Sequence, residues 1–152
     1  MKKIAIGSDP NAAGLKETIK TFLTEQGYEY EDYGSDDPIY ANVGLAVAEA
    51  VAAGKHDRGI LLCGTGIGMS ITANKVKGAY AACCSDPYST ERSVLSNNCN
   101  IMTLGAQVIG PELAKFLVGQ WLSLRYAPGG RSESKLRRIY EYAGDLKYSL
   151  SL

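Results

Sequence analysis

The chain has 152 residues, with 16 lysines and arginines against 16 aspartates and glutamates. This length fits one compact domain. A hydrophobic content of 45 % supplies a sizeable core, which excludes a disordered or fibrous protein. A net charge of zero removes the broad attraction that nucleic acids and anionic membranes require, so we expect neither as a partner. We expect a single domain over residues 1–146 and a short tail over 147–152.

Targeting signals and metal motifs are not evident. The sequence from Met1 to Gly7 holds two lysines and too short an apolar stretch for a signal peptide or membrane span, so we expect a cytoplasmic protein. The four cysteines lack C-x-x-C spacing and are expected to be reduced thiols. Because His56 is the only histidine, a His-rich metal site is excluded, and a Ser-His-Asp hydrolase would depend on that residue.

Apolar periodicity in the first half of the chain predicts alternating strands and helices. The predicted elements are strand 4–7, helix 13–26, strand 28–33, helix 40–53 and strand 59–63. Gly27 and Gly54 follow the two helices, where glycine commonly ends a helix. The strand 59–63 is continuously apolar, which is typical of a strand buried on both faces of a parallel sheet.

The second half continues the alternation. It predicts helix 67–75, strand 79–84, helix 86–95, strand 100–104 and helix 111–124. A basic last helix over 131–142 follows, docked on the core or reaching a neighbouring subunit. This order predicts an α/β fold: a doubly wound, Rossmann-like sheet of about five parallel strands, with helices on both faces and a C-terminal helix.

Two loops are candidate binding sites. Ligands of such a sheet bind at the carboxyl ends of strands near the switch in strand order, which selects loops 7–14 and 63–70. The glycines at 64, 66 and 68 could let backbone N–H groups face an anion, with a helix N-terminus behind them. Met69 stands where the dinucleotide fingerprint has its last glycine, and no P-loop lysine follows. The alternative interpretation of these glycines is a purely structural tight turn.

Cys63 is the candidate reactive residue of the second loop. N–H dipoles and a helix N-terminus at this point would favour its thiolate, which makes it a candidate base or nucleophile. We expect Cys83, Cys84 and Cys99 to be inert packing residues, since the first two lie in a predicted apolar strand and the third precedes one.

The segment 57–70, Asp-Arg-Gly-Ile-Leu-Leu-Cys-Gly-Thr-Gly-Ile-Gly-Met-Ser, resembles the signature of type B ribose-5-phosphate isomerases and galactose-6-phosphate isomerase subunits. The likeness extends to Ala-Asn-Lys-Val at 73–76, Gly-Ser-Asp at 7–9, Leu-Gly-Ala at 104–106, Val-Ile-Gly-Pro-Glu-Leu at 108–113 and Gly-Gly-Arg at 129–131. It implies an aldose-ketose isomerase of a small sugar phosphate, without metal or cofactor, that works through a cis-enediol. It also implies a homodimer, or a dimer of dimers, with sites between subunits.

The resemblance also implies roles for single residues. Cys63 matches the base that moves a proton between C1 and C2, and Thr65 matches a residue that stabilises the enediolate. Residues implied to bind the sugar, by side chain or backbone N–H, are Asp9, Tyr40, Gly64, Gly66, Ile67, Gly68 and Asn97.

Phosphate binding is implied for the start of the last helix. Arg131 matches a phosphate-binding arginine, and Lys135 stands where a second arginine is usual. Lysine keeps the charge but loses the bidentate fork. The alternative interpretation of Lys135, Arg137 and Arg138 is a solvated basic face.

Three positions depart from the family pattern. Pro10 replaces a histidine that often helps to bind phosphate, Gln107 replaces an arginine, and Ser96 replaces the histidine credited with opening the furanose ring. His56 precedes the third predicted strand, at the end opposite the candidate loops, and cannot replace it. Because a hydroxyl is a poor proton shuttle at neutral pH, we expect ring opening to be compromised.

A four-carbon sugar with phosphate on O4 needs no ring opening, because the hydroxyl that would attack the carbonyl is esterified. Family members with Ser-Asn-Asn, as at 96–98, also resemble isomerases that interconvert erythrulose 4-phosphate and erythrose 4-phosphate. Ser96 is therefore a candidate substrate-binding residue. The alternative function is a non-catalytic sugar-phosphate-binding protein, or one subunit of a hetero-oligomeric isomerase, because several usual site residues are missing.

Overall fold

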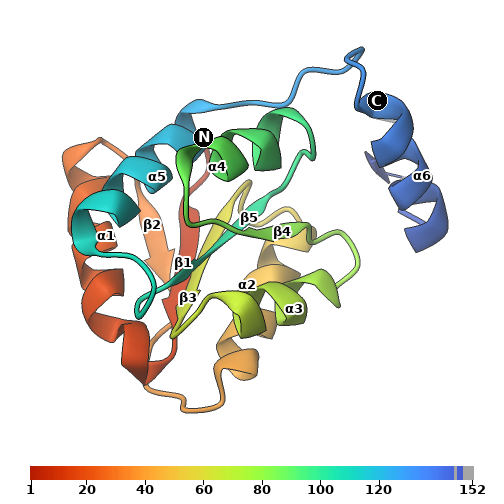
Figure 1. Cartoon of the computed structure of the whole chain (residues 1–152). Helices are drawn as coiled ribbons and strands as arrows, with labels where there is room; N and C mark the ends of the chain where they lie inside the picture. Colours follow the sequence, from red (N-terminus) through yellow and green to blue (C-terminus); the bar gives the residue numbers. More distant parts are fainter. Residues whose placement is uncertain (146, 149–152) are drawn as a thin grey trace.

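The computed structural model describes residues 1–145, 147 and 148. One sheet of five parallel strands has the order β2-β1-β3-β5-β4, with helices on both faces (Figure 1). The strands are β1 (Ile4–Ser8), β2 (Tyr30–Asp32), β3 (Gly59–Cys63), β4 (Ala81–Cys83) and β5 (Ile101–Gly105). The helices are η1 (Pro10–Ala12), α1 (Ala13–Glu25), α2 (Tyr40–Ala52), α3 (Ile67–Asn74), α4 (Pro87–Leu95), α5 (Pro111–Ser123) and α6 (Glu133–Ala143). The predicted α/β architecture is confirmed.

In three elements a boundary differs from the prediction by two residues. The edge strands β2 and β4 have three residues each, because each pairs with only one neighbour over three positions. The last helix begins at Glu133 rather than at 131: Gly129 adopts a positive φ of 92° and donates its N–H to the Glu133 carboxylate at 2.5 Å, which forms a turn before α6. Residues 146 and 149–152, at the end of the predicted domain and in its predicted tail, lie outside the described residues.

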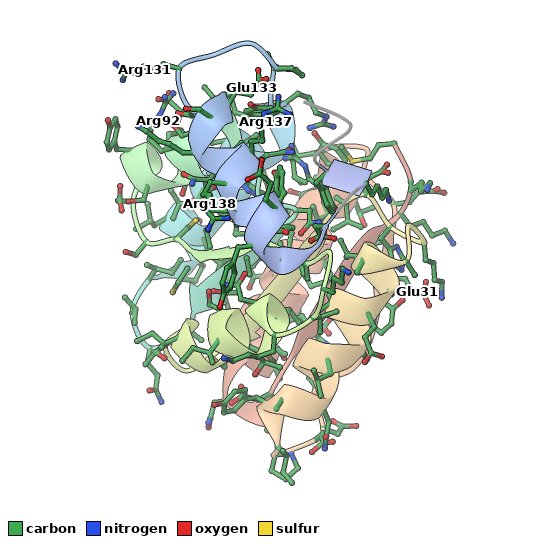
Figure 2. All side chains as sticks on the ribbon, turned by 90° about the vertical axis from the view of Figure 1, so that its right-hand side faces the viewer. Glu31, Arg92, Arg131, Glu133, Arg137 and Arg138 are labelled. Atoms are coloured by element: carbon green, nitrogen blue, oxygen red, sulfur yellow. The ribbon has the colours of Figure 1, made fainter. Side chains whose placement is uncertain are left out.

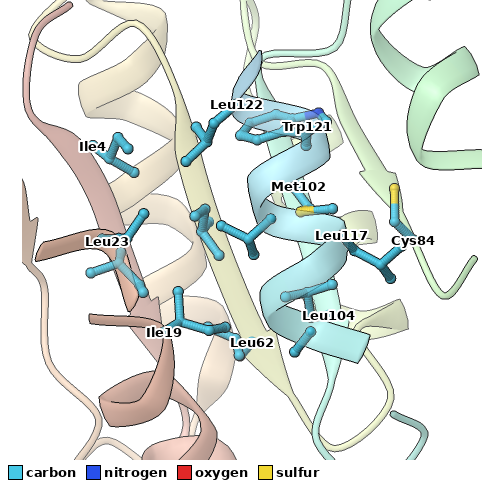
Figure 3. Close-up of a cluster of buried hydrophobic side chains, with 14 of the residues drawn as sticks. Ile4, Ile19, Leu23, Leu62, Cys84, Met102, Leu104, Leu117, Trp121 and Leu122 are labelled. Carbon is cyan, nitrogen blue, oxygen red and sulfur yellow. The ribbon is translucent and has the colours of Figure 1, made fainter. Parts of the chain in front are cut away.

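The sheet is buried on both faces, because successive strand residues point to opposite sides. One face packs against α1 and α5, where Trp121, Leu117 and Leu122 lie over Met102 and its neighbours (Figure 3). The other face packs against α2 and α3 and includes Leu61 and Cys63. Each fully buried side chain of leucine size contributes about 1.5–3 kcal/mol relative to an exposed one. This packing places Cys63 at the end of β3, on the α2 and α3 side.

A buried lysine joins α1 to the end of β2. Lys16 is 2 % exposed, and its ammonium lies 2.7 Å from the Asp32 carboxylate, which also binds Lys20 at 2.8 Å. Burial opposes ionisation of Asp32, but hydrogen bonds from the two lysines and from the Gly34 N–H outweigh it and lower its pKa to about 2. The network thereby anchors the edge strand β2 to α1.

The variant Asp32→Asn tests this network. It should lower the free energy of unfolding at pH 7 by on the order of 1 kcal/mol, a value reduced by solvent screening because Asp32 is partly exposed. The lowered pKa predicts that the loss is fully present above pH 3.8 and disappears as the pH falls towards 2. Urea unfolding at several pH values measures it.

The matched control is Lys55→Gln, which breaks an ion pair with Glu31 whose side chains are 58 % and 39 % exposed. It should lower the free energy of unfolding by less than Asp32→Asn does, because an exposed ion pair contributes little. Equal losses in the two variants, or a loss for Asp32→Asn that does not change with pH, would contradict the assigned role of Asp32.

Candidate active site

Asp9 follows β1 at the carboxyl edge of the sheet, the edge at which the strands end. It is 6 % exposed, and its carboxylate accepts the Ala12 N–H at 3.0 Å, so it caps the short helix η1. The Asp9 N–H donates to the Leu62 carbonyl at 3.2 Å. This bond fixes Asp9 beside the end of β3, next to Cys63.

Cys63 is the last residue of β3 and is 5 % exposed. The Gly66 N–H donates to its sulfur at 3.2 Å. Gly66 has a φ of +80°, a conformation that other residues rarely adopt, and this turn lets α3 begin at Ile67 directly above the sulfur. Thr65 Oγ1 accepts the Ile67 N–H at 3.2 Å, which leaves the hydroxyl proton able to donate elsewhere. The N–H groups of Gly66 and Ile67, two donors of the predicted anion cradle, are thus already bonded within the loop.

Strand β5 supports this loop from behind. The Thr103 hydroxyl, fully buried, donates to the Gly66 carbonyl at 2.8 Å. A Cβ on Gly105 would lie 2.5 Å from the Thr65 carbonyl oxygen, so only glycine admits the loop here. Sequence analysis did not single out Thr103, although a polar residue in an otherwise apolar strand was a usable signal. The loop is therefore held at a fixed distance from the sheet.

Two side chains from other elements reach the rim of the loop. Tyr40, the first residue of α2, lies so close to Gly68 that a Cβ there would overlap its ring. The Gln107 carboxamide lies 3.1 Å from the position of a Cβ on Gly64, and the Gln107 N–H donates to the Gly64 carbonyl at 2.9 Å. The structure thus brings Asp9, Tyr40 and the segment 63–68 together and adds Gln107 to them.

Ser96 and Asn97 lie at the amino edge, where the strands begin. They follow α4, and Asn100 of the same segment accepts the N–H of Gly59, the first residue of β3. Cys63 ends that strand. Ser96 and Asn97 therefore do not meet Cys63 within one chain.

Arg131 and Lys135 belong to the same side of the molecule as Ser96. Arg131 precedes α6 and Lys135 lies in its first turn, and both are exposed. Helix α6 docks through the buried Tyr140, whose hydroxyl accepts a hydrogen bond from the Asn98 amide at 3.4 Å. Figure 2 shows Arg131 at the same end of the molecule as Arg92 of α4. The predicted site residues thus form two groups, at opposite edges of the sheet.

The remaining cysteines fit the packing prediction only in part. Cys84 is buried and Cys99 is half-buried; burial raises the pKa of both thiols, that of Cys99 to about 12. The prediction for Cys83 is wrong, because its side chain is exposed. β4 is an edge strand, and the Cys83 thiol donates to the Thr65 carbonyl at 3.5 Å, beside the candidate loop.

His56 is a structural residue at the amino edge, as predicted from its place in the chain. It is 2 % exposed, and its two ring nitrogens bond the Lys3 carbonyl at 2.7 Å and the Tyr33 hydroxyl at 2.8 Å. With both nitrogens engaged, His56 has no free nitrogen for a substrate.

Two cavities lie away from the candidate loop. One of about 680 Å³ lies at the amino edge beside His56 and Asn98, and one of about 690 Å³ lies between α1 and α5. Neither cavity is lined by residues of the segment 63–68. Within residues 1–145, 147 and 148, no three His, Cys, Asp or Glu side chains gather as metal ligands. No helix in the described part of the chain is long and apolar enough to span a membrane.

The model of the ribose/galactose isomerase family matches residues 4–139. The chain belongs to this family. It is 49 % identical over 152 residues to D-erythrulose-4-phosphate isomerase of Pectobacterium atrosepticum, covering 97 % of this chain and 99 % of the relative. It is 48 % identical over 142 residues to ribose-5-P isomerase B of Listeria innocua, covering 91 % and 95 %. The solved structure of ribose-5-phosphate isomerase B from Clostridium thermocellum superposes with a TM-score of 0.87 at 44 % identity, covering 97 % and 99 %.

The family match confirms the resemblance on which the residue roles depend. The match with the solved structure supports the fold over nearly the whole chain. The near-equal identities to a tetrose-phosphate enzyme and to a pentose-phosphate enzyme leave the choice of substrate to the residues of the site.

Proposed function

We propose that this protein interconverts D-erythrulose 4-phosphate and erythrose 4-phosphate through a cis-enediol intermediate. The family and its relatives support the class of reaction, the aldose-ketose isomerisation of a sugar phosphate. The observation that carries the choice of a four-carbon substrate is Ser96, a hydroxyl where ring opening requires an acid. An open-chain tetrose phosphate makes that acid unnecessary.

Cys63 is the base of the proposed reaction. It removes a proton from C1 of the ketose, and the carbonyl oxygen at C2 becomes the enediolate oxygen. A proton then returns to C2, and the proton on O1 moves to the oxygen on C2. The product is the aldose, and no atom is gained or lost. The position of the sulfur supports this role: it is held by the Gly66 N–H at 3.2 Å, at the N-terminus of α3.

The loop and its neighbours stabilise the charge that develops on oxygen. The Thr65 hydroxyl accepts from the Ile67 N–H and keeps its own proton for the enediolate. Asp9 and Tyr40, at the rim of the loop, are placed to bind sugar hydroxyls. Because Thr103 and Gly105 hold the loop on β5, the Thr65 hydroxyl needs little rearrangement when substrate binds.

A second copy of the chain completes the site. Cys63 lies at the carboxyl edge, whereas Ser96, Asn97 and Arg131 lie on the other side of the molecule. A two-fold dimer brings Ser96, Asn97 and Arg131 of one copy to Cys63 of the other. The symmetry creates two equivalent sites of this kind. Arg131 and Lys135, exposed at the start of α6, then bind the phosphate from the second copy.

The Cys63→Ala variant tests the base. It should lower kcat by at least about 100-fold, because a positioned base contributes that factor or more. The control is Cys84→Ala, whose thiol is also buried but lies on the other face of the sheet, and which should keep most of the activity. Initial rates and thermal unfolding curves measure both variants. A Cys63→Ala enzyme that is as active as the control would show that another group is the base.

The unmodified protein tests the substrate. The value of kcat/KM on D-erythrulose 4-phosphate should exceed that on ribose 5-phosphate by at least about tenfold, because most ribose 5-phosphate is cyclic and Ser96 lacks the imidazole that opens rings. A coupled assay with both substrates side by side measures the ratio. A clear preference for ribose 5-phosphate would contradict the tetrose assignment and leave the isomerase class intact. Binding of both sugars without turnover by the purified chain would support the non-catalytic or hetero-oligomeric alternative.

A further inference from the structure

Arg92 is bonded to Ser96, the residue on which the substrate assignment depends. It lies in the last turn of α4, and its Nη1 donates to Ser96 Oγ at 3.2 Å. Its Nη2 lies 3.0 Å from the carboxylate of the adjacent Glu91. Its Nε is buried and has no hydrogen-bond partner in the part of the chain that the structure describes. The arginine side chain is 36 % exposed, so part of the guanidinium faces solvent.

Stability alone does not explain this arrangement. A buried N–H without a partner costs free energy, and an exposed ion pair between adjacent residues such as Arg92 and Glu91 contributes little. A basic residue near a helix C-terminus is favourable, but an exposed lysine would provide the same charge without burying a polar atom. The side chain is therefore held against Ser96 at some cost, and a buried polar atom of this kind calls for an explanation such as a role towards a ligand.

The Arg92 and Ser96 pair presents hydrogen-bond donors. Because Ser96 Oγ accepts from Arg92, its own hydroxyl proton remains to be donated. The guanidinium keeps N–H groups beyond those used by Ser96 and Glu91, and the neighbouring Asn97 is exposed. A guanidinium stays protonated at any physiological pH, so Arg92 binds anionic oxygen but cannot deliver a proton to open a ring.

We propose that Arg92, together with Ser96, binds the phosphate of the four-carbon substrate beside Arg131 and Lys135, which lie at the same end of the molecule. This inference rests on the proposed function. The oxygen that closes a furanose ring is O4, and in a tetrose 4-phosphate this same oxygen carries the phosphate. A residue placed to act on O4 of a pentose therefore meets the phosphate ester of a tetrose. Arg92 and Ser96 replace a ring-opening acid with an anion-binding pair, which selects the shorter substrate.

The variant Arg92→Met tests the pair, with D-erythrulose 4-phosphate and unphosphorylated erythrulose as substrates. It should lower kcat/KM for the phosphorylated sugar by about 10- to 100-fold, mainly through KM, and leave the value for erythrulose within about twofold. The matched control is Arg138→Met, an arginine on α6 that is 72 % exposed, which should change neither value. Equal losses on both sugars, or no loss on either, would overturn the proposal.

Two further measurements separate this proposal from a structural role and from the proposed function. In a double-mutant cycle, Ser96→Ala should have little further effect in the Arg92→Met background, whereas additive losses would show that the two residues act separately. Calorimetric titration with inorganic phosphate measures the affinity for the anion independently of turnover. Weaker phosphate binding by Arg92→Met supports the anion role even if the unmodified protein does not isomerise the tetrose. Unchanged phosphate binding contradicts the anion role whatever the activity.

Discussion

All five strands run parallel, so the residues that follow a strand gather at one edge of the sheet and the residues that precede a strand gather at the other. Asp9 and the loop that starts at Cys63 lie at the carboxyl edge, near the switch in strand order between β1 and β3. The segment 96–100 leads into β5 and lies at the amino edge. The residues proposed to bind substrate therefore fall into two groups at opposite edges of one chain, and a dimer is proposed because it would bring the two groups together.

Close packing makes the carboxyl-edge half rigid before any substrate arrives. Gly66 turns the chain above the Cys63 sulfur, Thr103 bonds the loop from the buried side, and Gly105 lets its backbone rest directly on β5. Each contact involves a residue of β3 or β5, strands whose residues are all buried, so loop motion would disturb the core. The amino-edge half depends on weaker links, such as the hydrogen bond between Asn98 and Tyr140 of α6.

Much of this structure could be predicted from the sequence, because local patterns determine it. The apolar runs that become β1, β3 and β5 and the glycine-rich loop after Cys63 identify the sheet and one half of the site. The exposure of the Cys83 side chain could not be predicted from the neighbouring residues, since it depends on β4 being an edge strand. The position of Ser96 could have been predicted. Residues that precede a parallel strand lie at the amino edge, and this holds for Ser96 before β5 as it does for His56 before β3. The bond from Arg92 to Ser96 was signalled by their spacing of four, with Arg92 on the predicted helix 86–95 and Ser96 directly after it.

In the proposed dimer, the base of one chain works with the phosphate-binding residues of the other. Mixing Cys63→Ala chains with Arg131→Ala chains, under conditions that exchange subunits, tests it most directly, because each mixed dimer then holds one site with both native residues. If Cys63 and Arg131 of different chains share a site, two inactive or weakly active preparations should recover about a quarter of the unmodified activity, since half of the dimers are mixed and each has one complete site of two. Activity that never exceeds the average of the two separate variants would show instead that Cys63 and Arg131 serve the same chain's site.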